Sequence, residues 1–142
     1  MVIYKMSEKR PNDFSPLALA YLGDSVWEQY VRDKILKENP DLPAHKLHKT
    51  AIGYVSAVSQ SKSMEKIETI LSDSELSVYK RGRNAKSPTA SKNADIVDYR
   101  RATGFEALIG YLYLKEEPDR LNEVMKTAYD YIHTERNRKN EL

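Results

Sequence analysis

The chain has 142 residues, no cysteine, and 23 basic against 21 acidic side chains, for a formal net charge of +2. A chain of this length can bury one hydrophobic core, so we expect a single domain that folds without disulfides or a structural metal. The lack of cysteine excludes thiolate zinc sites and cysteine nucleophiles and is typical of a reducing compartment, so we predict a cytoplasmic protein. No segment resembles a signal peptide or the roughly 20 apolar residues of a membrane span, so we expect no membrane partner.

The first half of the chain predicts helices in close succession. Ser15-Pro16 begins the first, because a serine hydroxyl caps the free amides of a first turn and proline lacks an amide hydrogen there. Apolar residues at three- and four-residue steps continue this helix over roughly 16–37, until Asn39-Pro40 ends it. Further helices are predicted from Pro43 to Ile52, from beyond Gly53 to about Leu71, and, after a Ser72 cap, to about Tyr79.

The second half begins with a predicted loop from Arg81 to Asn93, which is rich in Gly, Pro, Ser and Asn and has no apolar periodicity. Asp95 caps a helix that extends to Tyr113, and Pro118 precedes a last helix that includes Ile132. Because no segment shows the alternation of a strand, the predicted fold class is all-α.

Two acidic residues lie inside otherwise apolar helical segments. Asp24 follows Gly23 in the first helix, and Glu106 lies between Gly104 and Gly110 in the fifth. Burial of a carboxylate is unfavourable unless it finds a partner, and the glycines allow two helices to approach and bring both carboxylates together. Such a pair could hold Mg²⁺, which takes carboxylates, water and substrate phosphate as ligands. The alternative is that either acid lies at a helix edge or forms an internal salt bridge.

Basic residues are concentrated between Lys80 and Arg101. Seven basic residues face two acidic ones there, so the rest of the chain has a net charge of −3. This segment either contacts a nucleic-acid backbone or is a solvated connector; the concentration of charge favours phosphate contact, and loops of this length are often functional. The candidate RNA-binding residues are Arg81, Arg83, Asn84, Lys86, Ser87, Thr89, Lys92, Asn93 and Arg100.

Other residues that could carry chemistry give weaker signals. His45 and His48 have a common spacing and no evident third ligand, which disfavours a histidine metal site. Trp27 and most tyrosines fall within apolar stripes, so packing is their expected role, with Tyr79 and Tyr99 beside the basic segment as the exceptions.

Two motifs together resemble the ribonuclease III family. Leu22-Gly-Asp-Ser-Val26 is similar to the family's signature, and Phe105-Glu-Ala-Leu-Ile-Gly-Tyr-Leu-Tyr-Leu114 is similar to its second acidic motif. The order of the motifs, their separation by about eighty residues and the basic segment before the second extend the resemblance over roughly residues 14–134. Residues 1–13 would then be an N-terminal extension and 135–142 a flexible tail.

The resemblance implies the all-helical fold of a ribonuclease III endonuclease domain, assembled as a symmetric homodimer. It also implies Mg²⁺-dependent hydrolysis of double-stranded RNA that leaves 5′-phosphate and 3′-hydroxyl ends with short 3′ overhangs. Asp24 and Glu106 match the family's metal-binding and catalytic acids. The family's other two acids fall where this chain has Ala20 and Thr103, so a second metal ion is not predicted.

The reduced acid set, the Leu19-Ala-Tyr-Leu-Gly-Asp24 opening and the Arg81-Gly-Arg-Asn-Ala-Lys86 segment are similar to the bacterial Mini-III subfamily, which has no double-stranded-RNA-binding domain. This resemblance implies maturation of precursor 23S ribosomal RNA, with help from a ribosomal protein bound to the substrate. Mn²⁺ is expected to substitute for Mg²⁺.

The resulting hypothesis is that Asp24 and Glu106 coordinate Mg²⁺ while water attacks the phosphorus in line, and that the basic residues hold A-form RNA across its minor groove by shape. A two-fold dimer places one site against each strand, with the apolar first helix as the expected dimer element. The rival is a non-catalytic RNA-binding or ribosome-assembly factor on the same fold, which the retention of both acids disfavours.

Overall fold

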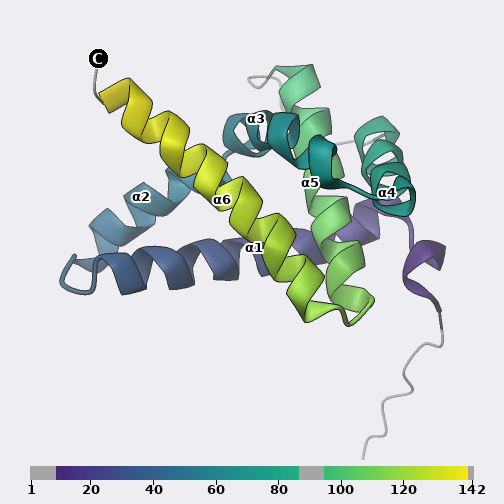
Figure 1. Cartoon of the computed structure of the whole chain (residues 1–142), viewed down its shortest axis with the longest axis horizontal. Coiled ribbons are helices and arrows are strands. Elements are labelled where there is room, and N and C mark those ends of the chain that lie inside the picture. Colours follow the sequence, from purple (N-terminus) through teal and green to yellow (C-terminus); the bar gives the residue numbers. More distant parts are fainter. Residues whose placement is uncertain (1–8, 87–94, 141–142) are drawn as a thin grey trace, which may run out of the picture.

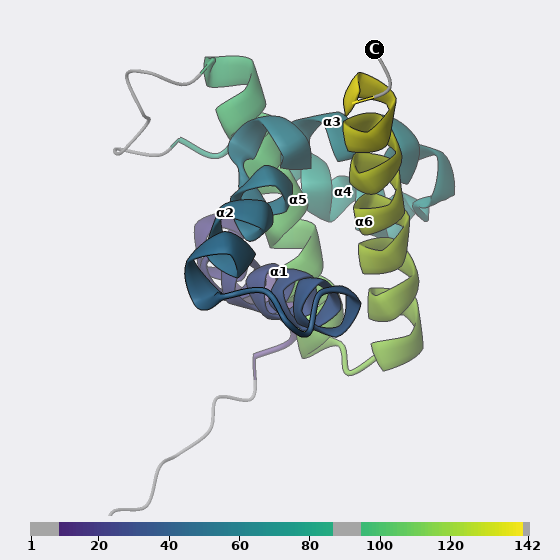
Figure 2. The same ribbon diagram turned by 90° about the vertical axis from the view of Figure 1, so that its left-hand side faces the viewer.

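The computed structural model describes residues 9–86 and 95–140, and in this part of the chain all regular structure is helical. Helix α5 is central, and α1, α3, α4 and α6 pack around it (Figures 1 and 2). The all-α prediction is confirmed, and none of the described helices is both long and apolar enough to cross a bilayer. The elements are η1 (Pro11–Asp13), α1 (Pro16–Glu38), α2 (Ala44–Val55), α3 (Ala57–Ile67), η2 (Glu68–Ile70), α4 (Asp73–Asn84), α5 (Ile96–Leu114) and α6 (Pro118–Asn140).

Side-chain caps explain where three helices begin, as the sequence predicts. The Ser15 hydroxyl accepts an amide hydrogen from the first turn of α1 at 3.2 Å, and the Asp95 carboxylate does the same for α5 at 2.8 Å. Ser72 and Glu75 form a reciprocal capping box at the start of α4, with N–O distances of 3.2 and 2.8 Å. Each cap satisfies an amide that has no partner within its own helix.

Two other boundaries differ from the sequence prediction. Helix α2 continues through Gly53 to Val55, and the break falls at Ser56, whose hydroxyl accepts from the backbone amide of Ser59 at 3.3 Å to cap α3. At the other end of the molecule, α6 continues past residue 134 to Asn140, where the polar composition predicted an end to regular structure.

The loop predicted to start at Arg81 is wrong at its beginning, because α4 continues to Asn84. Gly82 is buried against α5, where an added Cβ would lie 2.7 Å from the Cβ of Ala107. This tertiary packing overrides the low helix propensity of glycine, and the helix dipole favours basic side chains in a last turn. Residues 85 and 86 of the predicted loop are outside any helix, and residues 87–93 lie outside the described residues.

Aromatic side chains pack the contact between α1, α2 and α5. Trp27 is fully buried, meets the Phe105 ring edge-on at a centroid distance of 5.1 Å, and donates its indole N–H to the Tyr54 carbonyl at 3.2 Å. The predicted packing role of Trp27 is thus confirmed. Tyr79, which the sequence set apart from the core, is buried as well, so that prediction is wrong.

A buried ion pair joins the start of α4 to α6. Arg120 donates to both carboxylate oxygens of Glu75, at 2.7 and 2.8 Å, and to the Ile70 carbonyl at 2.6 Å. The hydrogen bonds from Arg120, with further ones from Ser72, outweigh the opposing effect of burial and hold the pKa of Glu75 at about 2. The charged pair therefore fixes the loop before α4 against α6.

This ion pair predicts a specific loss of stability in acid. The pKa of Glu75 falls from 4.5 to about 2 on folding, so its contribution is complete above pH 4.5 and is lost as pH falls toward 2. We expect Glu75→Gln, which can still form a capping box, to lower the free energy of unfolding at pH 7 by about 3 kcal/mol, with the difference shrinking below about pH 4. Urea unfolding measures both values. Glu123→Gln, which removes an exposed partner of Arg120, should cost less than about 1 kcal/mol; equal losses from the two variants would contradict this role.

Candidate active site

Helices α1 and α5 cross with their backbones in contact, because two glycines face each other there. A Cβ added to Gly23 would overlap the backbone carbonyl of Glu106 and lie 2.8 Å from the Gly110 nitrogen. A Cβ added to Gly110 would in turn overlap the backbone carbonyl of Leu19. The predicted close approach through Gly23 and Gly110 is therefore confirmed. Gly104 serves another contact, since its missing side chain makes room for Tyr79 of α4.

The crossing brings the side chains of Asp24 and Glu106 together. The two carboxyl groups are in hydrogen-bond contact, with Asp24 exposed to solvent and Glu106 mostly covered. Burial, followed by the neighbouring Asp24 carboxyl, raises the pKa of Glu106 to about 9. Glu106 therefore holds a proton at neutral pH in the metal-free chain, and its carboxyl ionises only when something replaces that proton.

Gln60 of α3 completes the surroundings of Glu106. Its side chain is 2 % exposed and donates to the Val55 carbonyl at 3.3 Å, and its interaction with the Glu106 carboxyl opposes the rise in the pKa of Glu106. The sequence analysis missed this residue. The sequence shows only an amide residue on the apolar face of a predicted helix. Such a residue is expected to find a hydrogen-bond partner, but the pattern does not identify which one.

No third acid joins the pair in the described part of the chain. Ala20 of α1 and Thr103 of α5 are both buried, and the Thr103 hydroxyl donates to the Tyr99 carbonyl at 3.0 Å. Across residues 9–86 and 95–140, no group of three or more His, Asp or Glu side chains could hold a metal ion. His45 and His48 are both exposed on α2.

The basic end of α4 lies alongside the α5 segment that carries Glu106. Gly82 packs against Gly104 and Ala107, so Arg81 and Arg83, its neighbours in sequence, are held on either side of that contact. The Arg81 side chain reaches back to the Asn12 carbonyl at 3.4 Å, and the Arg83 guanidinium lies 5.7 Å from the centre of the Tyr79 ring.

The other candidate RNA-binding residues divide into two groups. Asn84, Lys86 and Arg100 are exposed, and the Asn84 side-chain carbonyl accepts from Arg83 at 3.2 Å. The remaining four, Ser87, Thr89, Lys92 and Asn93, lie outside the described residues. The described members lie near the end of α4 and the start of α5.

Comparison with known proteins places this helical fold in one class. Residues 17–117 match the family model described as "Ribonuclease III domain". A Fusobacterium nucleatum protein solved by X-ray crystallography superposes with a TM-score of 0.77 at 28% sequence identity, over 86% of this chain and 98% of that one. The matched region includes both members of the carboxyl pair.

Two curated relatives define the group more narrowly. Mini-ribonuclease 3 of Clostridium tetani is 52% identical over 79% of this chain and 74% of its own length. Mini-ribonuclease 3 of Brevibacillus brevis is 46% identical over 88% of this chain and 92% of its own length. The chain belongs to the ribonuclease III family and, within it, to the Mini-ribonuclease 3 group. It is an endoribonuclease of this type.

Proposed function

We propose that this endoribonuclease hydrolyses double-stranded RNA with Mg²⁺ held by Asp24 and Glu106. The observation that carries the proposal is the pairing of two carboxyl groups at the crossing of α1 and α5, one exposed and the other mostly covered. Two carboxylates with no cation between them are unfavourable, and a divalent cation would reverse that cost. Oxygen donors of this kind suit Mg²⁺ and also Mn²⁺, which we expect to substitute.

The pair suits one divalent cation in each chain. When bound, Mg²⁺ supplies an activated water and neutralises charge on the departing oxygen of the phosphodiester. Asp24 provides the ligand exposed to solvent and substrate, and Glu106 provides the buried one, with its carboxyl oriented by Gln60. The expected products carry 5′-phosphate and 3′-hydroxyl ends.

Cationic side chains on α4 support the choice of a duplex RNA substrate. Arg81 and Arg83 are fixed beside the α5 segment that carries Glu106, and Lys86 after α4 and Arg100 near the start of α5 add further positive charge. Such groups bind phosphates of either strand without selecting bases, which suits recognition of A-form RNA by its shape. We propose that Asn84, Ser87, Thr89, Lys92 and Asn93 contribute to the same surface.

We further propose that the active form is a symmetric homodimer. Tyr21 is 84% exposed on α1, one turn before Asp24, and Tyr113 is 51% exposed on α5, two turns after Glu106. Large apolar side chains that remain exposed beside a site favour a contact with another chain. A two-fold contact through α1 would bring two carboxyl pairs to one duplex, so each strand would be cut and short 3′ overhangs would result.

The biological substrate that we propose is the precursor of 23S ribosomal RNA, processed in the cytoplasm with the help of a ribosomal protein bound to it. Membership of the Mini-ribonuclease 3 group supports this proposal. The expectation concerns the RNA chosen in the cell and leaves the chemistry of the carboxyl pair unchanged.

Defined duplex and single-stranded RNAs of one sequence test the proposed activity. We expect Mg²⁺-dependent cuts in the duplex alone, with products that a 5′-phosphate-dependent exonuclease degrades. The double variant Arg81→Gln/Arg83→Gln should weaken duplex binding, measured in EDTA. It should also reduce the magnitude of the slope of log K against log salt by about 1.8. The control variant Arg32→Gln should change neither quantity. Equal cleavage of single-stranded RNA, or products with 5′-hydroxyl ends, would contradict the proposed function.

Gln60 gives a separate prediction about positioning. We expect Gln60→Ala to reduce duplex cleavage about 10- to 100-fold and to raise the Mg²⁺ concentration needed for half-maximal rate, because the Glu106 carboxyl loses a partner that orients it. Ser63→Ala removes another buried polar group of α3, one that bonds the Gln60 carbonyl at 2.7 Å, and should change the rate little. A Gln60→Ala enzyme with unchanged Mg²⁺ dependence would rule out this role.

A further inference from the structure

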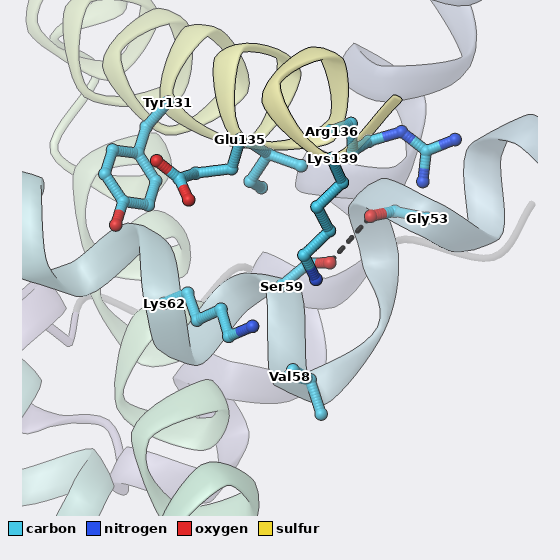
Figure 3. A pocket seen from close by; sticks show the side chains of 9 residues that line it. Gly53, Val58, Ser59, Lys62, Tyr131, Glu135, Arg136 and Lys139 are labelled. Carbon is cyan, nitrogen blue, oxygen red and sulfur yellow. Dashed lines mark hydrogen bonds between the residues drawn. The ribbon is translucent and has the colours of Figure 1, made fainter. Parts of the chain in front are cut away.

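A pocket of about 290 Å³ lies between α6 and the junction of α2 and α3 (Figure 3). Its walls include Gly53 of α2, Ser59 and Lys62 of α3, and Arg136 and Lys139 of α6. Helix α3 packs against both α5 and α6, and Gln60 of α3 interacts with Glu106 of α5. The pocket is therefore separate from the carboxyl pair, with α3 between them.

Three cations line this pocket, and within the described residues none of them forms an ion pair. They are Lys62, Arg136 and Lys139. The other cations of α6 are paired, as in Lys126–Asp130 at 2.6 Å. The one carboxylate in the wall, Glu135, pairs with Arg138 at 3.5 Å. The lining thus has a net charge of +2, because Glu135 is its one anion.

The pocket is shaped by contacts that hold its parts in place. The Arg136 guanidinium lies 5.2 Å from the centre of the Tyr54 ring, in the space left by the missing side chain of Gly53. The Ser59 hydroxyl donates to the Gly53 carbonyl at 2.6 Å and ties the start of α3 to α2. Figure 3 shows the side chains of Lys62 and Lys139 extending toward Ser59, with Glu135 on the other side beside Tyr131.

We propose that this pocket binds a phosphate group at Lys62, Lys139 and Arg136. The Lys62 and Lys139 ammonium groups extend toward Ser59, and the Arg136 guanidinium lies at the Gly53 end of the same pocket (Figure 3). The pocket is larger than one phosphate, and Val58 and Ile132 provide an apolar wall that suits an attached nucleoside. The phosphate can belong to an RNA strand or to a free nucleotide, because the recognising chemistry is the same. This site adds to the proposed cleavage function and does not depend on it.

The test uses the full chain in EDTA, which prevents cleavage, and the variant Lys62→Gln/Lys139→Gln. Titration of ¹⁵N-labelled protein with AMP and with inorganic phosphate should shift the amide signals of Ser59, Lys62 and Lys139 in the wild type and not in the variant. Fluorescence anisotropy with a short duplex RNA measures the salt dependence of RNA binding. The control, Lys37→Gln/Lys126→Gln, removes two lysines that are paired with Asp33 and Asp130 outside the pocket.

The outcomes separate the two sources of phosphate. If the pocket variant alone lowers the slope of log K against log salt by about 1.8 and weakens RNA binding several-fold, the phosphate belongs to RNA. If RNA binding is unchanged but AMP shifts the pocket signals, the ligand is a free nucleotide. The proposal is overturned if neither ligand shifts these signals and RNA binding matches the control. Duplex cleavage in Mg²⁺ should persist in the pocket variant, so failure here leaves the cleavage function intact.

Discussion

We expect Glu106→Gln to reduce RNA cleavage to below about a thousandth of the wild-type rate and, at the same time, to stabilise the metal-free protein. The carboxyl group has a pKa of about 9 in the folded chain, against 4.5 as its ordinary value. A raised carboxyl pKa means that the folded state loses stability as pH rises from 4.5 toward 9. Glutamine keeps the shape of the protonated acid and has no proton to lose.

The expected gain for Glu106→Gln is about 2 to 3 kcal/mol at pH 7 and close to zero at pH 4.5, measured by urea unfolding in EDTA. Mg²⁺ should then raise the Tm of the wild type and leave that of the variant unchanged, since only the wild type can replace its proton with the metal. Glu117→Gln, at an exposed carboxyl of the turn after α5, is the control and should leave activity and stability unchanged. A Glu106→Gln protein that is less stable than the wild type at pH 7 would contradict the buried-pair interpretation.

Gly23→Ala should have the largest effect on folding. Its Cβ would overlap the backbone carbonyl of Glu106, and a backbone atom can move only if α1 and α5 separate. We expect a loss of about 3 kcal/mol, a Tm lower by about 10 °C, and loss of cleavage as Asp24 moves away from Glu106.

Gly53→Ala provides a matched control in another helix. The Cβ added there meets only the end of the Arg136 side chain, which can rotate away. Since alanine favours a helix interior over glycine by up to about 1 kcal/mol, this variant should be as stable as the wild type or slightly more so. Thermal unfolding gives the Tm of the Gly23→Ala and Gly53→Ala variants. Similar Tm values would show that backbone contact does not hold α1 and α5 together.

The sequence was most informative where a local signal has a single physical meaning. Ser15, Ser72 and Asp95 could be identified as caps because a short polar side chain before an apolar stripe satisfies the free amides of a first turn. The proximity of Asp24 and Glu106 could be predicted because each acid lies in an apolar helical segment that also contains glycine, Gly23 in one and Gly104 and Gly110 in the other. Burial of a carboxyl group without a partner is unfavourable, so the sequence predicts that each of the two acids is the partner of the other.

Features that depend on contacts between distant segments could not be predicted. The helical state of Arg81 to Asn84 depends on the fit of Gly82 against α5, while its local composition is that of a loop. Gly104 was grouped with the α1 contact because it precedes Glu106, yet it faces Tyr79 of α4. The choice between helix neighbours requires knowledge of which face each residue occupies.

The residues that surround the carboxyl pair and the pocket could not be predicted from the sequence either. Gln60 lies 46 positions from Glu106 in a segment where periodicity predicts only a helix. The cations of the pocket come from α3 and α6, which the sequence treats as unrelated surface charges. Spacing along a chain identifies a face of one helix but not the helix opposite it.

The most direct measurement is incubation of the purified chain with a long duplex RNA in Mg²⁺ and in EDTA, beside the variant Asp24→Asn. We expect cleavage in Mg²⁺, none in EDTA, and none by the variant in either condition, while the variant still binds the RNA. Cleavage that persists in Asp24→Asn would contradict the assignment of the carboxyl pair, and binding without cleavage in Mg²⁺ or Mn²⁺ would favour an RNA-binding factor on the same fold.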